Sequence, residues 1–308
     1  MKKFSILLLL ALLSALSGEL LYYLKDGFSA RRVQSLPYPV AEGWDTDAGG
    51  ALEQPFRYIG RGRQCFAFSS ADRKYVLKLP RTDIYKTPFW VRSLPLPSYR
   101  ARLEADHLER ETFILNSFQL SASELKRQTA LIALHLGQSA PSGKELTLID
   151  ALGCTHRFPL HKTPFILQLK QPILMQSFQT ALAKGDQKEA ERILDALLAV
   201  IVERASQGIL NRDRSFLRNY GYDGQTAYQI DVGSFFRKPD LTPSDAYEKS
   251  IRDSTDPILE WLAQNAPHMR DYFSAAVQEN GLSLKQRAKT GSWPTKPGHR
   301  SHRSTPDS

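Results

Sequence analysis

The chain has 308 residues, of which 42% are hydrophobic and 24% charged, an ordinary balance for a globular protein that can build one large domain or two lobes. Two cysteines exclude a disulfide-rich scaffold, and no Cys or His pair has zinc-ligand spacing. The formal net charge is +9, but residues 285–308 supply five of these charges, so we expect no specific nucleic-acid partner for the mildly basic remainder. This Pro-, Gly- and Ser-rich basic tail is predicted to be disordered.

Two interpretations fit the N-terminus. Two lysines precede an apolar run of about 13 residues, which fits an export signal cleaved near Gly18. If Glu19 lies near one membrane interface, the hydrophobic helix reaches Leu24 and is long enough to be an uncleaved anchor. We therefore expect residues 1–25 to be a signal peptide or membrane anchor. The protein would be anchored in a membrane or exported, and either side of the membrane fits these two interpretations.

The next segment, residues 26–54, contains several Pro and Gly residues and no sustained hydrophobic period, which predicts a linker. The fold is expected to begin near Pro55. There, "FRYIGRGRQCFAFSS" and "KYVLKL" predict two strands of a hairpin with its turn at Asp72. The first of these strands contains a glycine pair, Gly60 and Gly62.

A long helix is predicted for residues 99–126, where helix breakers are absent and apolar side chains recur at helical spacing. Glu104, Leu108, Glu111 and Leu115 share one face of this helix. Three apolar runs follow, "TALIALHLG", "ELTLIDAL" and "TPFILQLKQPI", and each predicts a strand.

The second half of the chain is predicted to be mainly helical. Asp186 can cap a helix that has Glu189 three residues later, an apolar stripe along its length and Gly208 at its end. Residues 243–267 and 269–281 predict two or three shorter helices. The element order therefore predicts an α+β fold with a β-rich first lobe, a helical second lobe and a cleft between them.

Candidate chemistry lies in the stretch "GILNRDRSFLRNYGYDGQTAYQIDVGSF". Asp223–Gly224 predicts a tight turn between two strand-like segments, so Asn219 and Asp231 are expected at the open end of one hairpin. Asp213 enters from the loop that follows the capped helix. A carboxylate and an amide suit a magnesium ion that shares its ligand shell with phosphates. A second carboxylate could accept a proton from an attacking hydroxyl, a combination that points to phosphoryl transfer.

The order of these residues resembles the catalytic half of the protein-kinase-like superfamily. The "NRD" that ends at Asp213 is similar to His-Arg-Asp, Asn219 matches the catalytic-loop asparagine, and the "DVG" that begins at Asp231 is similar to Asp-Phe-Gly. The pattern departs from the family in several places. Asn211 replaces the histidine, and no Ala-Pro-Glu motif follows. Asn219 comes six residues after Asp213, where the family spacing is about five.

The upstream motifs of the same family are present in the expected order. "IGRGRQCFAF" is similar to the glycine-rich loop, with Gly60 and Gly62 matched and a cysteine in place of the third glycine. "YVLKL" is similar to the strand that carries the family lysine, which would be Lys78. The long helix offers Glu111 as the ion-pair partner of this lysine, with Glu104 as the second candidate.

The resemblance covers about residues 56–275. It implies a two-lobed kinase-like domain in residues 55–284, with an N-lobe near 55–170 and a C-lobe near 171–284. The implied activity is that of a distant, atypical kinase that transfers the γ-phosphoryl group of ATP to an unidentified hydroxyl acceptor, either a protein or a small molecule.

The resemblance also implies a role for each matched residue. The nucleotide would be bound by Gly60, Gly62, Lys78 and Glu111. Asn219 and Asp231 would hold Mg²⁺, and Asp213 would position or deprotonate the acceptor hydroxyl.

Two alternatives remain open from the sequence. A catalytically inactive kinase-like binding module would fit the missing glycine and the shifted asparagine, whereas the retained Lys78, Asp213 and Asp231 speak against it. The second alternative is a membrane-anchored or exported interaction domain whose resemblance to kinases arises by chance. An outward-facing domain would meet little ATP, and this conflict would be resolved by an exported kinase that acts inside another cell, by an anchor of opposite orientation or by the binding module.

Overall fold

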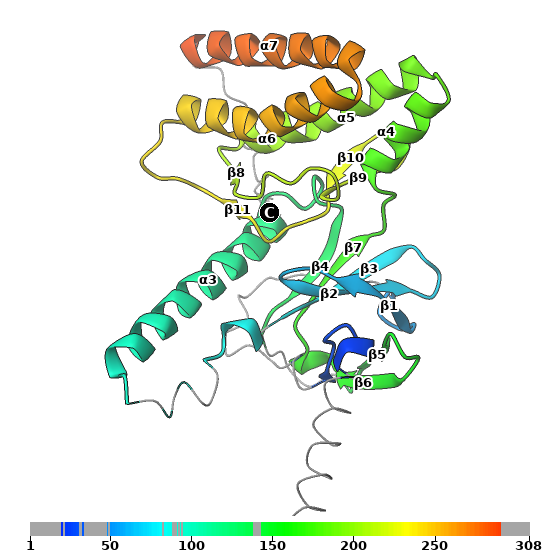
Figure 1. Ribbon diagram of the computed structural model, residues 1–308, viewed down its shortest axis with the longest axis vertical. Coiled ribbons are helices and arrows are strands. Elements are labelled where there is room, and N and C mark those ends of the chain that lie inside the picture. Colours follow the sequence, from blue (N-terminus) through cyan, green and yellow to red (C-terminus); the bar gives the residue numbers. More distant parts are fainter. Residues whose placement is uncertain are drawn as a thin grey trace, which may run out of the picture.

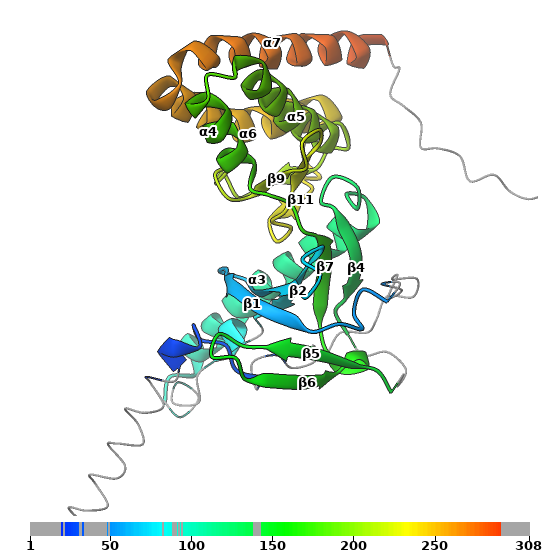
Figure 2. The same cartoon turned by 90° about the vertical axis from the view of Figure 1, so that its right-hand side faces the viewer.

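The computed structural model describes residues 22–30, 50–81, 83–87, 95–137 and 143–290, together with the single positions 20, 33, 48, 91 and 93. For residues 280–290 only the backbone is described. Figure 1 shows a β-sheet towards one end of the molecule and a group of helices at the other, with the long helix α3 beside the sheet. The view turned by 90° in Figure 2 shows the same separation. The predicted α+β layout, strands first and helices second, is confirmed.

One mixed sheet dominates the first half of the chain, with the strand order β4-β7-β3-β2-β1-β5-β6. The strands are β1 (Phe56–Arg61), β2 (Cys65–Ser70), β3 (Tyr75–Pro80), β4 (Leu131–His135), β5 (Glu145–Ile149), β6 (Thr155–Pro159) and β7 (Phe165–Leu169). Neighbours are antiparallel except β1 and β5, which run parallel. Aromatic and aliphatic side chains from these strands form a buried cluster that holds the sheet in place.

Two details of the sheet differ from the sequence prediction. The sequence predicts a single first strand, and this prediction is wrong, because the structure has two strands there, β1 and β2. Gly62 N donates a hydrogen bond to Cys65 O at 2.8 Å, and this turn reverses the chain between the two strands. Gly60 lies at a bulge in the β1–β2 register, where its φ is 155°. Strand β6 lies between two of the three apolar runs, where the sequence predicts no strand. Its sequence, "THRFP", has little apolar character because it forms the edge of the sheet.

The helical part contains α4 (Leu174–Ala183), α5 (Gln187–Ser206), α6 (Pro243–Asn265) and α7 (Pro267–Thr290), while α3 spans Pro97–Ser123. The predicted start of α5 is confirmed, since the Asp186 carboxylate accepts a hydrogen bond from Glu189 N at 3.0 Å. The C-terminal segment forms two helices, and α7 continues past residue 284, the predicted end of the domain. Residues 291–308 of the predicted tail lie outside the described residues.

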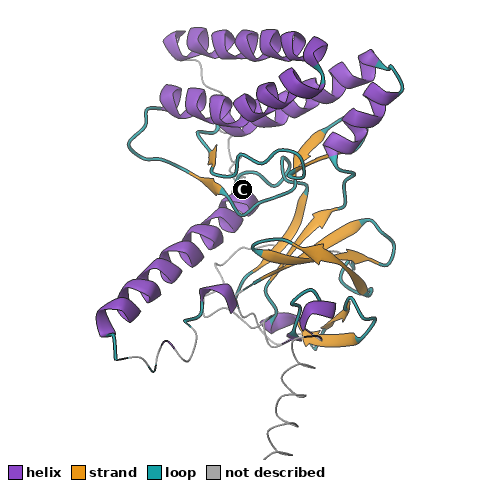
Figure 3. Cartoon of the chain, viewed as in Figure 1, coloured by secondary structure: helices purple, strands orange, loops and turns teal. Residues whose placement is uncertain are grey.

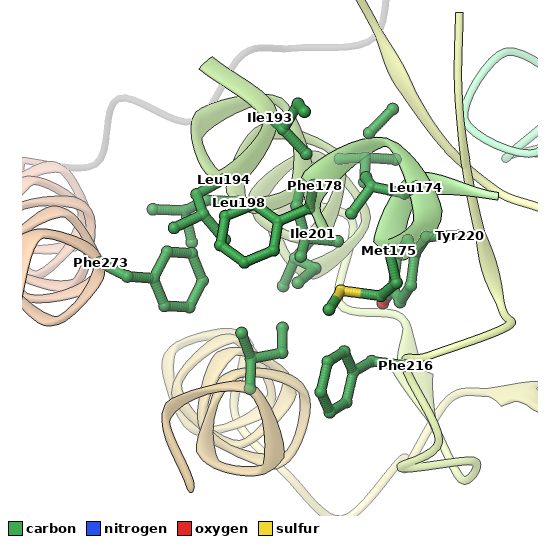
Figure 4. Packing of buried hydrophobic residues seen from close by; sticks show 14 of the residues in the cluster. Leu174, Met175, Phe178, Ile193, Leu194, Leu198, Ile201, Phe216, Tyr220 and Phe273 are labelled. Atoms are coloured by element: carbon green, nitrogen blue, oxygen red, sulfur yellow. The ribbon is translucent and has the colours of Figure 1, made fainter. Parts of the chain in front are cut away.

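The apolar stripe of α5 packs in the centre of the helical part. Figure 4 shows Phe178 of α4 surrounded by Leu194, Leu198 and Ile201 of α5, with Phe273 of α7 close by. Such a core stabilises the helices far more than their intrinsic propensities do.

Two short antiparallel pairs lie between the sheet and the helices, as Figure 3 shows. One joins β8 (Leu210–Asn211) to β11 (Phe235–Phe236), and the other joins β9 (Tyr220–Tyr222) to β10 (Ala227–Gln229). The predicted turn of the second pair is confirmed, because the Asp223 carboxylate accepts hydrogen bonds from the backbone N–H groups of Gln225 and Thr226.

Part of the predicted linker is packed against the sheet, so the linker prediction is wrong there. The Phe28 side chain is 2% exposed and makes edge contacts with the rings of Phe66 and Phe68. Tyr58 OH donates to the Asp26 carboxylate at 2.6 Å. A single aromatic residue in a Gly- and Pro-containing segment has no periodicity, yet it contributes substantial buried area.

The predicted signal peptide or anchor lies mostly outside the described residues, which include only 20 and 22–25 of that segment. Among the helices of the described residues, none combines the length and the apolar character needed to cross a bilayer.

Candidate functional site

A cavity of about 680 Å³ lies where the sheet, α3 and the loops between β8 and β11 meet. Its walls come from the β1–β2 turn, the strands β2 and β3, the helix α3 and the segment 212–234. The lining residues are Gly62, Arg63, Gln64, Cys65, Ala67, Lys78, Ile84, Tyr85, Arg110, Phe113, Ile114, Phe118, Arg212, Asp213, Arg218, Asn219, Ile230, Asp231, Val232 and Ser234.

Most of the residues predicted to carry the chemistry line this one cavity. Lys78, Asp213, Asn219 and Asp231 are all present, together with Gly62 of the β1–β2 turn. More than 130 positions separate Lys78 from Asp213 along the chain, so the fold and not local sequence brings them together. Two of the predicted nucleotide-binding residues, Gly60 and Glu111, do not line the cavity.

Lys78 lies on β3, and its ammonium group reaches across the cavity to the second half of the chain. Its Nζ donates a hydrogen bond to the backbone carbonyl oxygen of Ile230, the residue before Asp231. Burial lowers the pKa of Lys78, and the nearby Asp231 carboxylate opposes this effect. The lysine and Asp231 therefore both line the cavity, close enough for their charges to interact, although no direct ion pair joins them among the described residues.

Glu111 does not form the predicted ion pair with Lys78 within the described part of the chain. Burial raises the pKa of Glu111, and the cation that opposes this effect is Lys86. The cavity face of α3 instead carries Arg110, Phe113, Ile114 and Phe118. Glu111 is seven residues before Phe118 and so lies in nearly the same direction, at the margin of this face, but it is not among the residues that line the cavity. Glu104, the second candidate, is exposed.

Asp213 and Asn219 are in direct contact despite their unusual spacing. Asn219 Nδ2 donates to Asp213 Oδ2 at 3.0 Å, and Ser215 N donates to Asp213 Oδ1 at 2.8 Å. A turn from Phe216 to Asn219 accommodates the extra residue, with the Phe216 ring packed at the edge of Trp261. The longer loop therefore still delivers Asn219 to the cavity.

Asn219 and Asp231 lie at the open end of the β9–β10 hairpin, as predicted. Ile230 N donates to Asn219 O at 2.8 Å, which fixes the two chain segments side by side. Because Asn219 donates its amide nitrogen to Asp213, its side-chain oxygen remains for a ligand. Asp231 Oδ1 accepts from Gly233 N at 3.3 Å, and its other carboxylate oxygen has no hydrogen bond within the described residues.

One amide oxygen and one carboxylate oxygen fit a magnesium ion that takes the rest of its ligands from water and phosphate. These two oxygens are too few to bind a metal ion without further ligands from water or phosphate. In the described ranges no group of three or more His, Cys, Asp or Glu side chains could hold a metal ion.

The β1–β2 turn contacts the Asp-Val-Gly segment directly. Gln64 Nε2 donates to Gly233 O at 3.1 Å, and a Cβ added to Gly233 would lie 1.5 Å from Gln64 Oε1. Glycine at 233 therefore permits the close approach of the turn. Cys65, which stands in place of the third glycine, lines the cavity and is partly buried, and this burial raises its pKa to about 12, so its thiol is neutral.

Sequence reasoning missed the basic character of the cavity. Four arginines line it in addition to Lys78, namely Arg63, Arg110, Arg212 and Arg218. Two of them could have been found, because they flank Asp213 and Asn219 in the loop sequence. Arg110 could not, since its position depends on the rotation of α3.

The solved structures to which this chain is similar include two structures of WbdD. One is a medium-resolution structure of the bifunctional kinase-methyltransferase WbdD, with 17% identity and a TM-score of 0.36 over 83% of this chain and 46% of that chain. The other is a high-resolution crystal structure of WbdD, with 17% identity and a TM-score of 0.35 over 67% of this chain and 35% of that chain. This chain spans less than half of the length of either structure. No family model matches the sequence, and no curated protein matches it.

Proposed function

We propose that this protein is a kinase-like phosphotransferase that moves the γ-phosphoryl group of ATP to a hydroxyl acceptor. The observation that supports the proposal most strongly is the convergence of Lys78, Asp213, Asn219 and Asp231 on one cavity. A lysine, a carboxylate–amide pair and a further carboxylate are the groups that phosphoryl transfer needs for positioning and charge neutralisation.

In this proposal, the nucleotide phosphates lie between the β1–β2 turn and Lys78. Gly62 leaves space beside the turn, and a Cβ there would meet no atom closer than 3.6 Å. Lys78 supplies a positive charge in a partly buried position, where its attraction to phosphate is screened less than at the surface. Asn219 and Asp231 would hold Mg²⁺ through the two oxygens that their neighbours leave available, and this ion would neutralise phosphate charge.

Asp213 would receive the acceptor. Both of its carboxylate oxygens already accept one hydrogen bond, from Ser215 N and Asn219 Nδ2, and this fixes the orientation of the group. Each oxygen retains a further lone pair that can accept from the acceptor hydroxyl. The hydroxyl oxygen forms a bond to the γ-phosphorus while the bond from phosphorus to the bridging oxygen breaks. ADP leaves with that electron pair, and the hydroxyl proton passes to Asp213.

Calorimetric titration of the full chain with the non-hydrolysable analogue AMP-PNP, with and without Mg²⁺, tests the nucleotide site. Binding is expected to depend on Mg²⁺, and Lys78→Met and Asp231→Ala should each weaken it by about tenfold or more, because the first removes a positive charge beside the phosphates and the second removes a ligand of the Mg²⁺ that would neutralise them. Lys74→Met is a matched control, since Lys74 is exposed and does not line the cavity. An unchanged dissociation constant in both cavity variants would contradict the proposal.

One observation favours a second candidate, a nucleotide-binding module without transferase activity. Lys78 has no carboxylate partner on α3 and donates instead to the Ile230 carbonyl. Measurement of ADP formation in the presence of hydroxyl compounds separates the two candidates. Turnover that disappears in Asp213→Asn supports the enzyme. Tight analogue binding with no turnover for any acceptor, including water, supports the module.

A further inference from the structure

We infer that the acceptor of this site carries a phosphate or carboxylate group in addition to the hydroxyl that is phosphorylated. This inference rests on the proposed function, and it concerns the part of the cavity that the nucleotide residues do not occupy. Three arginines supply the evidence. They are Arg110 of α3 and Arg212 and Arg218 of the loop that carries Asp213.

The cavity holds more positive charge than its own carboxylates can balance. Five basic side chains line it, whereas Asp213 and Asp231 are its only lining carboxylates among the described residues. The charge of Asp231 already interacts with that of Lys78, and the Cys65 thiol is neutral because burial raises its pKa. Arg110 and Arg218 are exposed and form no ion pair or side-chain hydrogen bond within the described residues, so their charges remain available to a ligand.

Arg212 is held in place without being neutralised. Its guanidinium carbon lies 5.4 Å from the centroid of the Phe113 ring, and its backbone N–H donates to Ser234 O at 2.8 Å. A guanidinium that stacks on a ring keeps its N–H donors in the guanidinium plane, where they can bind an anion in a bidentate manner. Phe113 therefore orients Arg212 and leaves its donors available.

Arg110 lies on the same face of α3 as Phe113, three residues earlier, and both line the cavity. Arg212 stacks on Phe113, and Arg110 lies one helical turn from Phe113. The two arginines therefore place two positive charges at one wall of the cavity. Both side chains are exposed, so water screens part of their repulsion, and an anion between them would be attracted by both. This arrangement favours a bound anion at that wall.

The wall belongs to the acceptor side of the cavity. Arg212 directly precedes Asp213, the residue that would contact the acceptor hydroxyl, whereas Lys78 and the β1–β2 turn come from the sheet. An anion held by Arg110 and Arg212 would fix an acceptor molecule while its hydroxyl meets Asp213. The site would then select phosphorylated or carboxylated hydroxyl compounds over neutral ones, because a neutral compound leaves the two cations without a counter-charge.

Inorganic phosphate is the probe for this subsite. The full chain is first saturated with AMP-PNP and Mg²⁺, and phosphate is then titrated by ³¹P nuclear magnetic resonance. We expect saturable phosphate binding in the wild type and a loss of affinity of about tenfold or more in the double variant Arg110→Gln, Arg212→Gln, since two charge-assisted contacts are removed. The control is Arg252→Gln, because Arg252 is exposed and lies outside the cavity.

Three results would overturn the inference. They are no saturable phosphate binding in the wild type, equal binding in the double variant, and a loss of AMP-PNP affinity in the double variant as large as the loss of phosphate affinity. The last result would assign the arginines to the nucleotide.

The proposed function fails separately, through absence of AMP-PNP binding. In that case the phosphate titration of the nucleotide-free chain still decides whether the arginines bind an anion. A second measurement addresses the acceptor class directly, by comparing glucose with glucose 6-phosphate as acceptors. Turnover is expected with the phosphorylated sugar and not with the neutral one, and equal turnover with both would contradict the inference.

Discussion

The docking of the N-terminal segment onto the sheet depends on Asp150, whose side chain is 0% exposed. Its carboxylate forms an ion pair with Lys25 at 2.9 Å and accepts from His156 Nε2 at 2.8 Å. It also accepts hydrogen bonds from the backbone N–H groups of Leu152 and Cys154. Burial alone would raise the pKa of Asp150, but these donors outweigh burial and lower the pKa from 3.8 to about 2.

The lowered pKa of Asp150 gives the size of its contribution to the free energy of unfolding and the pH range in which this contribution is lost. One pKa unit corresponds to about 1.4 kcal/mol, so the charged carboxylate stabilises the folded state by about 2 kcal/mol at neutral pH. Because the folded pKa lies below the unfolded one, this stabilisation is fully present above the unfolded value of 3.8 and is lost as the pH falls towards 2. The variant Asp150→Asn keeps an oxygen for the two N–H groups but loses the charge that faces Lys25 and His156.

Urea unfolding of the full chain, followed by circular dichroism between pH 7 and pH 3, measures this contribution. The wild type should exceed Asp150→Asn by about 2 kcal/mol at pH 7, and the difference should shrink as the pH approaches 3. Asp106→Asn controls for the loss of an exposed carboxylate. A difference that stays constant over this range, or that is absent at pH 7, would refute the role of the buried charge.

Three further predictions follow from individual contacts. Phe28→Ala should cost about 3–5 kcal/mol of unfolding free energy, measured by urea unfolding, because it empties a site in the sheet core, and a cost under 1 kcal/mol would contradict the packing. Asp186→Ala should cost about 1 kcal/mol in the same assay through loss of the α5 cap, whereas no cost would show that the cap is dispensable. Glu111→Gln should leave the AMP-PNP dissociation constant unchanged, since Glu111 does not contact Lys78, and a tenfold loss would instead reveal the ion pair predicted from the sequence.

The sequence predicts those features that repeat locally. The apolar stripe and the Asp186 cap predict α5 within a few residues, and short apolar runs predict β4, β5 and β7. Edge strand β6 was missed because it buries few side chains and has no apolar pattern. Phe28 was missed because one buried aromatic residue has no period.

The candidate site was predictable only where its residues follow one another in a known order. Lys78, Asp213, Asn219 and Asp231 were found through that order, and the cavity contains them all. The side of α3 that faces the cavity was not predictable, because it depends on the rotation of the helix about its axis. Arg110 lines the cavity, whereas Glu111, at the margin of the same helix face, does not.

The rotation of α3 is fixed by a buried polar contact. The hydroxyl group of Ser117, which is 0% exposed, donates to Val232 O at 2.6 Å and accepts from Phe235 N at 2.6 Å. Buried backbone groups without such partners would cost about 1–3 kcal/mol each, so the contact holds α3 and the segment after Asp231 as one body. Arg110 and Asp231 therefore keep a fixed relation to each other. Lys78 comes from the sheet, and its position relative to Asp231 depends on how the sheet packs against that body.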